Sequence, residues 1–258
     1  MIRDRPISPG AKSPRLVWCA ALAGMLVVSA GCHLRTPKQA FPENLVAFGD
    51  SITRGYAVPV GEGWVELLAH RMQAEDGPGR PGVSVFNAGG NANTSAEGMK
   101  RIERDVYPHL PGVVAIEFGG NDATHDARHV SVEQFELNLL TICRLVKERG
   151  GKPVLVTFPP VINAWHAFHG DSYYARWGGL DQCVEEYRQR TRAVARRMGY
   201  PLFDLDLLLR KKITATGPER WILRDGVHLT PQAHQFVAQE FMAFLRNRGF
   251  VDAADLRD

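Results

Sequence analysis

Three residues of this chain, far apart in the sequence, have the side-chain types that nucleophilic catalysis requires. Ser51 lies in Gly-Asp-Ser-Ile at residues 49–52, directly after the apolar run at residues 45–48, and Asp225 and His228 stand three residues apart near the C-terminus. A serine hydroxyl becomes a nucleophile when a histidine takes its proton and a carboxylate orients that histidine. The three residues therefore predict a serine nucleophile, with one imidazole nitrogen of His228 held by Asp225 and the other facing Ser51.

Each of these residues also has an ordinary structural explanation. A serine after an aspartate often caps the next helical turn, and an aspartate in a loop often caps a turn. His228 is one of nine histidines, and a lone histidine is more often structural or exposed. The order of the three residues, and the elements between them, favour the catalytic interpretation.

The elements that must position these residues alternate between strand and helix. Short, continuous apolar runs predict strands buried on both faces of a parallel sheet, at Leu45–Phe48, Val83–Asn87, Val113–Phe118, Val154–Phe158 and Leu202–Leu205. Helical patterns lie between and after them, at Trp64–Gln73, Ala96–Tyr107, Val132–Arg149, Leu180–Met198 and about Pro231–Arg246. This alternation predicts an α/β fold with a central parallel sheet, doubly wound, and helices on both faces.

In such sheets the functional site lies beyond the carboxyl ends of the strands, where Ser51, Asn87 and Asn121 all fall. Two connections are long, Pro159–Gly179 and Leu207–Gly226. Long loops in compact domains tend to be functional. The first is rich in aromatic residues, so we expect it to wall the substrate pocket, its rings either stacking on sugar or acyl groups or packing the loop.

Four blocks in order make the chain similar to the GDSL/SGNH hydrolase family, over nearly all of the predicted mature domain. They are Gly-Asp-Ser-Ile-Thr-Arg-Gly at 49–55, Asn-Ala-Gly-Gly-Asn-Ala-Asn-Thr-Ser at 87–95, Gly-Gly-Asn-Asp at 119–122 and Asp-Gly-Val-His at 225–228. The resemblance implies a three-layer α/β/α, flavodoxin-like fold. It also implies hydrolysis of carboxylic esters through an acyl-enzyme, without a metal or another cofactor.

The resemblance assigns a role to each site residue. It implies Ser51 as the nucleophile, His228 as general base and then acid, and Asp225 as its orienting partner. The oxyanion hole would combine the Ser51 backbone N–H, a backbone N–H from residues 87–95 and the side-chain amide of Asn121. An amide is a neutral donor, so it stabilises an oxyanion without adding a titrating group.

The second block departs from the family's usual Asn-x-Gly-x-x-Gly-x-Thr, in which the last glycine supplies the backbone donor. Aligned without a gap, that position is Ala92. Alanine keeps the N–H, but its Cβ penalises a positive φ. We expect Ala92 to be the donor in a backbone compatible with alanine, and the alternative is that Gly90 donates after a local shift.

Other polar residues near the predicted site have structural explanations. We expect Asp50 and Asp122 to hold loops by hydrogen bonds rather than to transfer protons, and Asn87 to tie the loop of the second block. Two groups of side chains resemble metal ligands but lie on a polar loop and on the aromatic connection, namely His125, Asp126 and His129, and His166, His169 and Asp171.

The arginines of residues 183–198 are expected on a solvated helix face, with a membrane-facing surface as the alternative. Cys143 and Cys183 are expected to be buried free thiols, with a disulfide as the alternative.

The N-terminus carries the pattern of a secretory signal. Basic residues precede an apolar run from Leu16 to Ala30, which is short for a spanning helix, and Gly31-Cys32 follow it. Residues 28–32 resemble a bacterial lipobox, with Ser29 in place of the usual leucine. We expect residues 1–31 to be a signal peptide and Cys32 to be acylated after cleavage. A signal peptide without lipidation and an uncleaved anchor are the alternatives.

The remaining boundaries follow from composition. Residues 32–42 contain two prolines and are predicted to be a tether, residues 43–250 to be the hydrolase domain, and residues 251–258 to be a C-terminal tail. The 258 residues, 45% hydrophobic and 23% charged, suit one globular α/β domain. A net charge of +3 without long like-charge blocks gives no indication of nucleic-acid binding. We expect export across the inner membrane, followed by a membrane-anchored or a periplasmic or extracellular location.

The expected substrate is an acetyl or short-acyl ester of a carbohydrate or another small alcohol, including polysaccharide esters. The tryptophan, tyrosine and histidine side chains of residues 159–179 favour a polar alcohol portion. One alternative is a lipolytic esterase of the lysophospholipase or thioesterase type. An alternative of another class is a non-catalytic binding domain that keeps the fold. That alternative predicts the loss of a catalytic residue, whereas Ser51, Asn121, Asp225 and His228 are all present.

Replacing Cys32 with alanine tests the predicted anchor. Acyl chains transferred into a membrane hold a protein there by apolar burial, so Cys32→Ala should move the mature protein from the membrane fraction to the soluble fraction. Immunoblotting of both fractions measures this, with Cys143→Ala as a control that should stay with the membrane. Retention of the Cys32→Ala protein in the membrane fraction would show that the anchor is not Cys32.

Overall fold

The computed structural model describes residues 44–75 and 83–251, so the predictions for the N-terminus, including Cys32, lie outside the described residues. The described part contains a five-stranded parallel sheet with the strand order β2-β1-β3-β4-β5. The strands are β1 (Asn44–Gly49), β2 (Ser84–Gly89), β3 (Val113–Glu117), β4 (Lys152–Val156) and β5 (Leu202–Phe203). The predicted α/β class with a central parallel sheet is confirmed.

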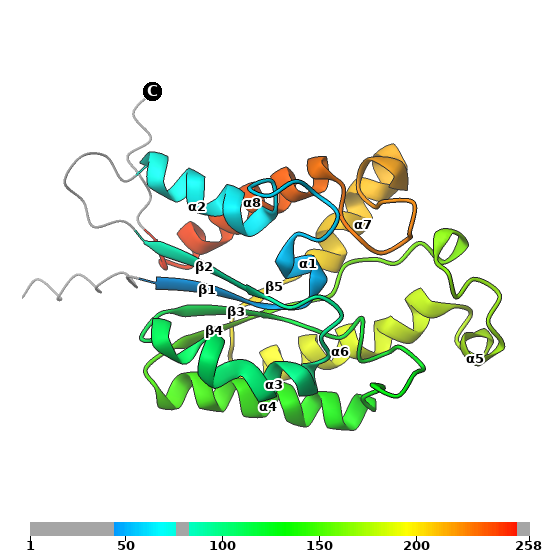
Figure 1. Ribbon diagram of the computed structural model, residues 1–258, viewed down its shortest axis with the longest axis horizontal. Coiled ribbons are helices and arrows are strands. Elements are labelled where there is room, and N and C mark those ends of the chain that lie inside the picture. Colours follow the sequence, from blue (N-terminus) through cyan, green and yellow to red (C-terminus); the bar gives the residue numbers. More distant parts are fainter. Residues whose placement is uncertain (1–43, 76–82, 252–258) are drawn as a thin grey trace, which may run out of the picture. The chain divides into compact units, whose positions relative to one another are not determined.

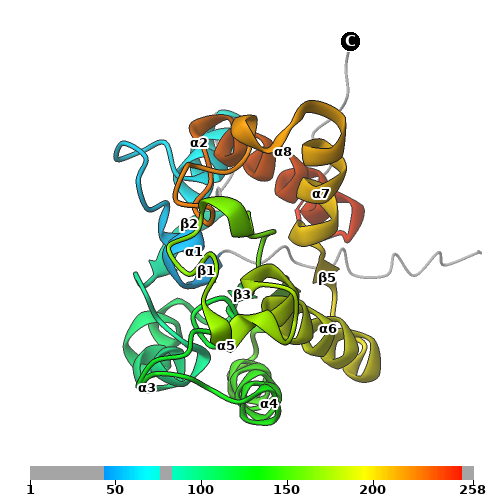
Figure 2. The same ribbon diagram turned by 90° about the vertical axis from the view of Figure 1, so that its right-hand side faces the viewer.

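Helices cover both faces of the sheet (Figure 1 and Figure 2). One face carries α2 (Trp64–Glu75), α7 (Leu205–Thr216) and α8 (Pro231–Asn247), and the other carries α3 (Ser95–Asp105), α4 (Val132–Glu148) and α6 (Leu180–Met198). Shorter pieces complete the described part: the helices α1 (Ser51–Arg54) and α5 (Ser172–Ala175), and the 3₁₀ turns Tyr107–His109, Asn163–Trp165 and Pro218–Arg220. The three layers are those of a flavodoxin-like fold.

The apolar strands form because both of their faces are covered. In β1, Val46, Ala47 and Phe48 are fully buried, and all five residues of β3 are buried. The carboxyl ends of β1, β2 and β3 are level, because Gly49 pairs with Gly89 on one side and with Glu117 on the other. Connections leave β1 and β3 in opposite directions along the sheet, which makes this edge the topological switch point.

The connection predicted between Leu207 and Gly226 is mostly helix, so the prediction of a long loop there was wrong. Asp204 caps α7 by accepting a hydrogen bond from the Leu207 N–H, and this cap also ends β5 at Phe203. Leu205 and Leu209 are buried at a helical spacing. The periodicity was therefore present in the sequence, and the cap residue marks where the helix begins.

The arginines of α6 do not all lie on a solvated face, contrary to the sequence prediction. The Arg188 side chain is fully buried and donates to the carbonyl oxygens of Phe158 and Pro159 at 3.0 and 2.6 Å and to Asp181 at 2.8 Å. Arg196 on the same helix is exposed, as predicted. Because Phe158 and Pro159 are buried, their carbonyl groups are shielded from water and need protein donors.

One further sequence prediction concerns the two cysteines of the described residues. Cys143 and Cys183 are buried free thiols, and burial raises the pKa of these thiols to about 12 and about 11. They are therefore poor nucleophiles. Within residues 44–75 and 83–251, none of the helices is both long enough and apolar enough to span a membrane.

Replacing Arg188 with methionine should strongly destabilise the domain. Methionine keeps much of the volume but leaves the Phe158 and Pro159 carbonyls without donors and removes a partner of Asp181. Breaking a buried pair from one side costs about 3–5 kcal/mol. Urea unfolding would measure this loss against Arg196→Met, which should change the free energy of unfolding by no more than about 0.5 kcal/mol. Equal stability of the two variants would contradict the structural role of Arg188.

Candidate active site

Ser51 begins α1, directly after the carboxyl end of β1. The helix is capped by the preceding residue, since Asp50 Oδ1 accepts a hydrogen bond from the Ile52 N–H at 2.9 Å. The Ser51 hydroxyl is therefore not the cap, and its Oγ instead lies 3.0 Å from His228 Nε2. The helix-cap explanation of Ser51 fails because Asp50 already fills that role.

His228 is held by Asp225 within one tight turn. His228 Nδ1 lies 2.6 Å from Asp225 Oδ2, while Asp225 Oδ1 accepts the N–H groups of Val227 at 2.9 Å and His228 at 3.0 Å. Partial burial acts to raise the pKa of Asp225, but the hydrogen bonds from Val227 and His228 outweigh it and lower that pKa. An ionised carboxylate thus orients the imidazole. The chain from Asp225 through His228 to Ser51 is an arrangement that can make a serine hydroxyl nucleophilic.

Asn121 follows β3 and lies beside the start of α1. Its side-chain Nδ2 donates to Asp50 Oδ2 at 3.0 Å and to the Asn93 carbonyl oxygen at 3.2 Å. The same Asp50 carboxylate therefore caps the helix that begins with Ser51 and orients the Asn121 amide. Asn93 belongs to the turn that follows β2, and β2 lies on the opposite side of β1 from β3. The second block therefore reaches the Asn121 amide from the other side of β1.

The two predicted backbone donors of the second block differ in what they bind. The Gly90 N–H donates to the Gly49 carbonyl oxygen at 2.9 Å. Among the described residues the Ala92 N–H has no acceptor, so it is available to a ligand. Ala92 has a φ of 57°, in the left-handed region that costs alanine about 1–2 kcal/mol, and Arg128 holds the Ala92 carbonyl oxygen at 2.8 Å. Asn87 ties this loop as expected, since its Oδ1 accepts the Gly89 N–H at 2.9 Å.

Ser51, Asn121 and His228 open on a small cavity of about 140 Å³. Its other walls are mainly apolar and come from segments that follow β3 and β4, from α6 and from the turn before His228: Gly120, Thr124, Phe158, Val161, His166, Leu180, Val184 and Val227. A Cβ on Gly120 would lie 2.2 Å from the Phe158 ring, so glycine is required for Phe158 to form this wall.

Comparison with known proteins agrees with this geometry. Residues 47–236 match the GDSL-like lipase/acylhydrolase family. The chain belongs to this family. The family resemblance inferred from the four blocks is thereby confirmed, and the chain is an esterase that acts on ester bonds.

The acylhydrolase is similar to proteins from several bacteria. An uncharacterized lipoprotein of Bacillus subtilis (strain 168), YqeF, is 33% identical over 196 residues, which are 70% of this chain and 75% of that protein. An arylesterase of Vibrio mimicus is 28% identical over 207 residues, 79% of this chain and 90% of that protein. The crystal structure of a lipase/acylhydrolase from Enterococcus faecalis has a TM-score of 0.63 and 26% identity, covering 80% of this chain and 96% of that one.

A pair of buried carboxyl groups lies beneath the serine of this acylhydrolase. Asp50 is fully buried, and Glu117, the last residue of β3, is 2% exposed. Thr53 Oγ1 donates to Glu117 Oε2 at 2.9 Å. Gly49 makes room for this contact, since a Cβ there would lie 2.2 Å from Thr53 Oγ1. A charged residue within the apolar run 113–118 was the sequence signal that could have revealed the pair.

Burial makes these acids hard to ionise. Burial, and then the charge of Glu117, raise the pKa of Asp50 well above its ordinary value. Burial raises the pKa of Glu117 to about 7, against the opposing effect of its hydrogen bonds with Thr53 and Asp50. Two carboxylates side by side without a cation repel each other, so one proton stays on the pair near neutral pH. That proton gives the Asp50 and Glu117 carboxyls a hydrogen bond that two ionised groups cannot make.

The remaining polar candidates have the structural contacts expected of them or lie apart. Asp122 accepts hydrogen bonds from the Ser95 N–H at 3.0 Å and from the Ser95 hydroxyl at 2.5 Å, which ties the Asn121 loop to α3. Throughout residues 44–75 and 83–251, no three metal-binding side chains gather at one point. His125 stacks on Tyr173 with ring centroids 3.6 Å apart, and Asp171 caps α5.

The acid pair should make stability depend on pH. Glu117 keeps its proton in the folded state up to about pH 7, but in the unfolded chain it loses the proton near pH 4.5. Its contribution to the free energy of unfolding is therefore fully present below about pH 4.5 and is lost as the pH rises to about 7. Glu117→Gln removes this titration and keeps the shape. The free energy of unfolding of the wild type should fall between pH 5 and pH 8. In Glu117→Gln this fall should be smaller by about 2 kcal/mol.

Urea unfolding at the two pH values measures this difference. Glu103→Gln on the exposed side of α3 is the matched control, and it should leave the pH dependence as in the wild type. An unchanged pH dependence in Glu117→Gln would mean that Glu117 ionises at an ordinary pH.

Proposed function

We propose that this esterase uses Ser51 as its nucleophile, His228 as general base and then acid, and Asp225 as the orienting carboxylate. The observation that carries the proposal is the unbroken hydrogen-bonded chain from Asp225 to Ser51, at 2.6 and 3.0 Å, at the mouth of a cavity. As Ser51 Oγ bonds to the ester carbonyl carbon, its proton passes to His228 Nε2. The tetrahedral intermediate then expels the alcohol, which takes that proton. A water molecule then gives a proton to the same nitrogen as its oxygen bonds to the acyl carbon. The second tetrahedral intermediate collapses, which releases the carboxylic acid and returns that proton to Ser51 Oγ.

The oxyanion hole in this proposal consists of the Ser51 N–H, the Ala92 N–H and the Asn121 amide. The Ser51 N–H lies in the first turn of α1, where backbone N–H groups have no partner within the helix. Ala92 is preferred to Gly90 because the Gly90 N–H is already bound to Gly49. The Asn121 amide is held by Asp50, and its longer bond to Asn93, at 3.2 Å, is the one that an oxyanion would replace.

The proposed substrate is an acetyl or short-acyl ester of a carbohydrate or another small alcohol. Small-molecule sites usually enclose roughly 300–1,000 Å³, and the cavity at Ser51 has only about 140 Å³. Its apolar walls, formed by Phe158, Val161 and Val184, suit the alkyl end of a short acyl group. The similarity to an arylesterase supports an ester with a small alcohol portion.

We further propose that the protein is held at a membrane surface by a lipid on Cys32. The lipobox-like residues 28–32 support this, and so does the similarity to a protein named a lipoprotein. An enzyme held at a membrane surface in this way would act on esters in the space outside the inner membrane.

Ser51→Ala should lower the turnover of p-nitrophenyl acetate at least roughly 10⁴-fold, because the nucleophile is lost while the fold stays intact. A fluorophosphonate probe should label the wild type and leave Ser51→Ala unlabelled. Ser84→Ala on the exposed edge of β2 is the control and should behave as the wild type in both assays. Full turnover by Ser51→Ala would refute the mechanism, and a folded wild type without labelling would favour a non-catalytic binding domain.

The size of the acyl group can be tested with p-nitrophenyl esters of increasing chain length. Because the cavity at Ser51 is small, kcat/KM should be highest for acetate or butyrate and should fall at least tenfold by octanoate. A maximum at octanoate or longer would instead identify a lipolytic esterase of the lysophospholipase or thioesterase type.

A further inference from the structure

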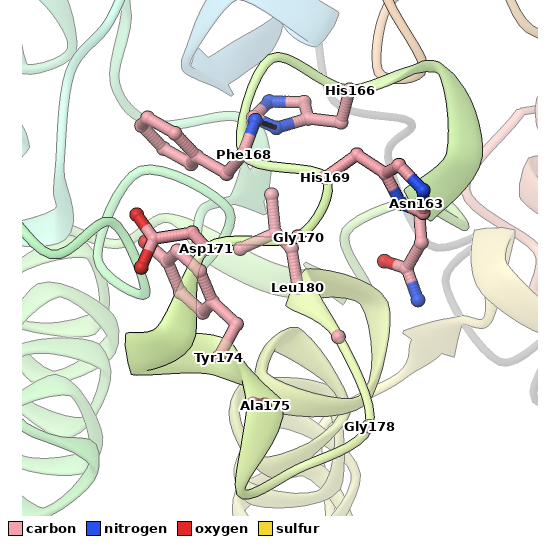
Figure 3. Close-up of a pocket in the computed structure, with 11 residues that line it drawn as sticks. Asn163, His166, Phe168, His169, Gly170, Asp171, Tyr174, Ala175, Gly178 and Leu180 are labelled. Carbon is pink, nitrogen blue, oxygen red and sulfur yellow. Dashed lines mark hydrogen bonds between the residues drawn. The ribbon is translucent and has the colours of Figure 1, made fainter.

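A second cavity lies beside the one at Ser51, within the lid segment, which we define as residues 159–179. It encloses about 280 Å³ and shares two residues, His166 and Leu180, with the cavity at Ser51. Figure 3 shows His166 and Phe168 at one end of this lid cavity and Ala175 and Gly178 at the other. The two cavities together reach the volume of a small-molecule site, which the cavity at Ser51 does not reach alone.

The walls of the lid cavity are fixed by hydrogen bonds to α6. Asn163 accepts the Asp181 N–H at 2.8 Å and donates to Gln182 Oε1 at 2.8 Å. Gly179 lies against this amide, since a Cβ there would be 2.2 Å from Asn163 Nδ2. The lid segment is also joined to the catalytic turn, because the Ile162 N–H donates to the Gly226 carbonyl oxygen at 2.8 Å. The cavity is therefore preformed next to His228, so a ligand would not have to order it.

The lining of the lid cavity combines an aromatic floor with a polar rim. Tyr174 and Leu180 are buried beneath it, and the Phe168 ring stacks on Tyr174 with centroids 5.6 Å apart. His169 and Asp171 are exposed at its rim. Aromatic faces suit the C–H face of a sugar ring, and the polar rim suits its hydroxyl groups. None of the residues that line the cavity is a lysine or an arginine, so a phosphate headgroup would find no permanent cation there.

His166 presents a neutral donor at the junction of the two cavities. Its Nδ1 accepts the Phe168 N–H at 3.1 Å, which leaves the ring proton on Nε2. Burial lowers the pKa of His166, and the nearby His228 lowers it further, although Asp225 acts in the opposite direction. A neutral imidazole N–H is suited to an ester or hydroxyl oxygen that passes between the cavities.

We infer that the lid cavity is the binding site for the alcohol portion of the ester, that this portion is a neutral polyhydroxylated ring such as a sugar, and that His166 positions it. The inference rests on the proposed function, in which the cavity at Ser51 takes the acyl group. A long acyl chain would place methylene groups against His169 and Asp171, so it fits this cavity less well.

Ala175→Trp tests the inference by filling the lid cavity from its exposed rim. The ratio of kcat/KM for acetylated methyl xyloside to kcat/KM for p-nitrophenyl acetate should fall at least tenfold. Ala164→Trp introduces the same side chain at an exposed position of the lid segment that does not line the cavity, and it should leave this ratio unchanged. A ratio that is the same in both variants would overturn the inference. So would a selective loss of p-nitrophenyl octanoate turnover in Ala175→Trp.

A second measurement needs only the wild type. Free methyl xyloside should inhibit p-nitrophenyl acetate hydrolysis competitively, because it would occupy the lid cavity next to Ser51. Absence of inhibition by methyl xyloside and by methyl glucoside would overturn the sugar assignment while leaving the esterase mechanism intact. A wild type inactive on every ester would instead refute the proposed function.

Discussion

The level carboxyl ends of β1, β2 and β3 are the constraint on which the site depends. Gly49 pairs with Gly89 and with Glu117 in one register, so the turns that follow all three strands start at the same height. Ser51, Ala92 and Asn121 come from these three turns. A shift of one residue in either pairing would move a whole turn away from Ser51. Gly49 itself has no space for a side chain, because the contact between Thr53 and Glu117 passes over it.

Buried charge holds the loops around this edge in two different ways. Within the described part of the chain neither Asp50 nor Glu117 forms an ion pair, so a proton makes their contact favourable. Arg188 is buried among backbone carbonyl groups and Asp181. The opposite charge of Asp181 and the hydrogen bonds to the carbonyl groups offset the cost of removing the Arg188 charge from water. The first arrangement positions the Asn121 amide and α1, and the second positions Phe158 and the chain that walls the cavity. Both use polar groups that water cannot reach, where a lost partner is expensive.

The reaction and its selectivity are placed on different parts of the molecule. The proposed nucleophile and oxyanion donors lie on turns fixed by the central sheet, whereas the lid cavity is formed by the segment between β4 and α6. Val161 and His166 of the lid segment line the cavity at Ser51, and the Ile162 N–H binds the Gly226 carbonyl oxygen. Changes at lid residues that line only the lid cavity, such as Ala175, can therefore alter which alcohol is bound without moving Ser51 or His228. Such separation is common where a rigid scaffold presents a variable loop.

The sequence by itself determined the α/β class, most of the elements, and the residues that could form a site. These depend on local signals: continuous apolar runs, helical spacing and short blocks such as Gly-Asp-Ser and Asp-Gly-Val-His. The helix α7 was missed although its spacing was present. Tertiary structure alone decided that Asp50 rather than Ser51 caps α1. It also decided that the Gly90 N–H is bound to Gly49 while the Ala92 N–H is available. On α6, it decided that Arg188 is buried while Arg196 is exposed. It also decided that His166 lies near His228. Each of these outcomes rests on contacts or burial set by packing between distant segments, and a local pattern does not specify which donors and acceptors such segments bring together.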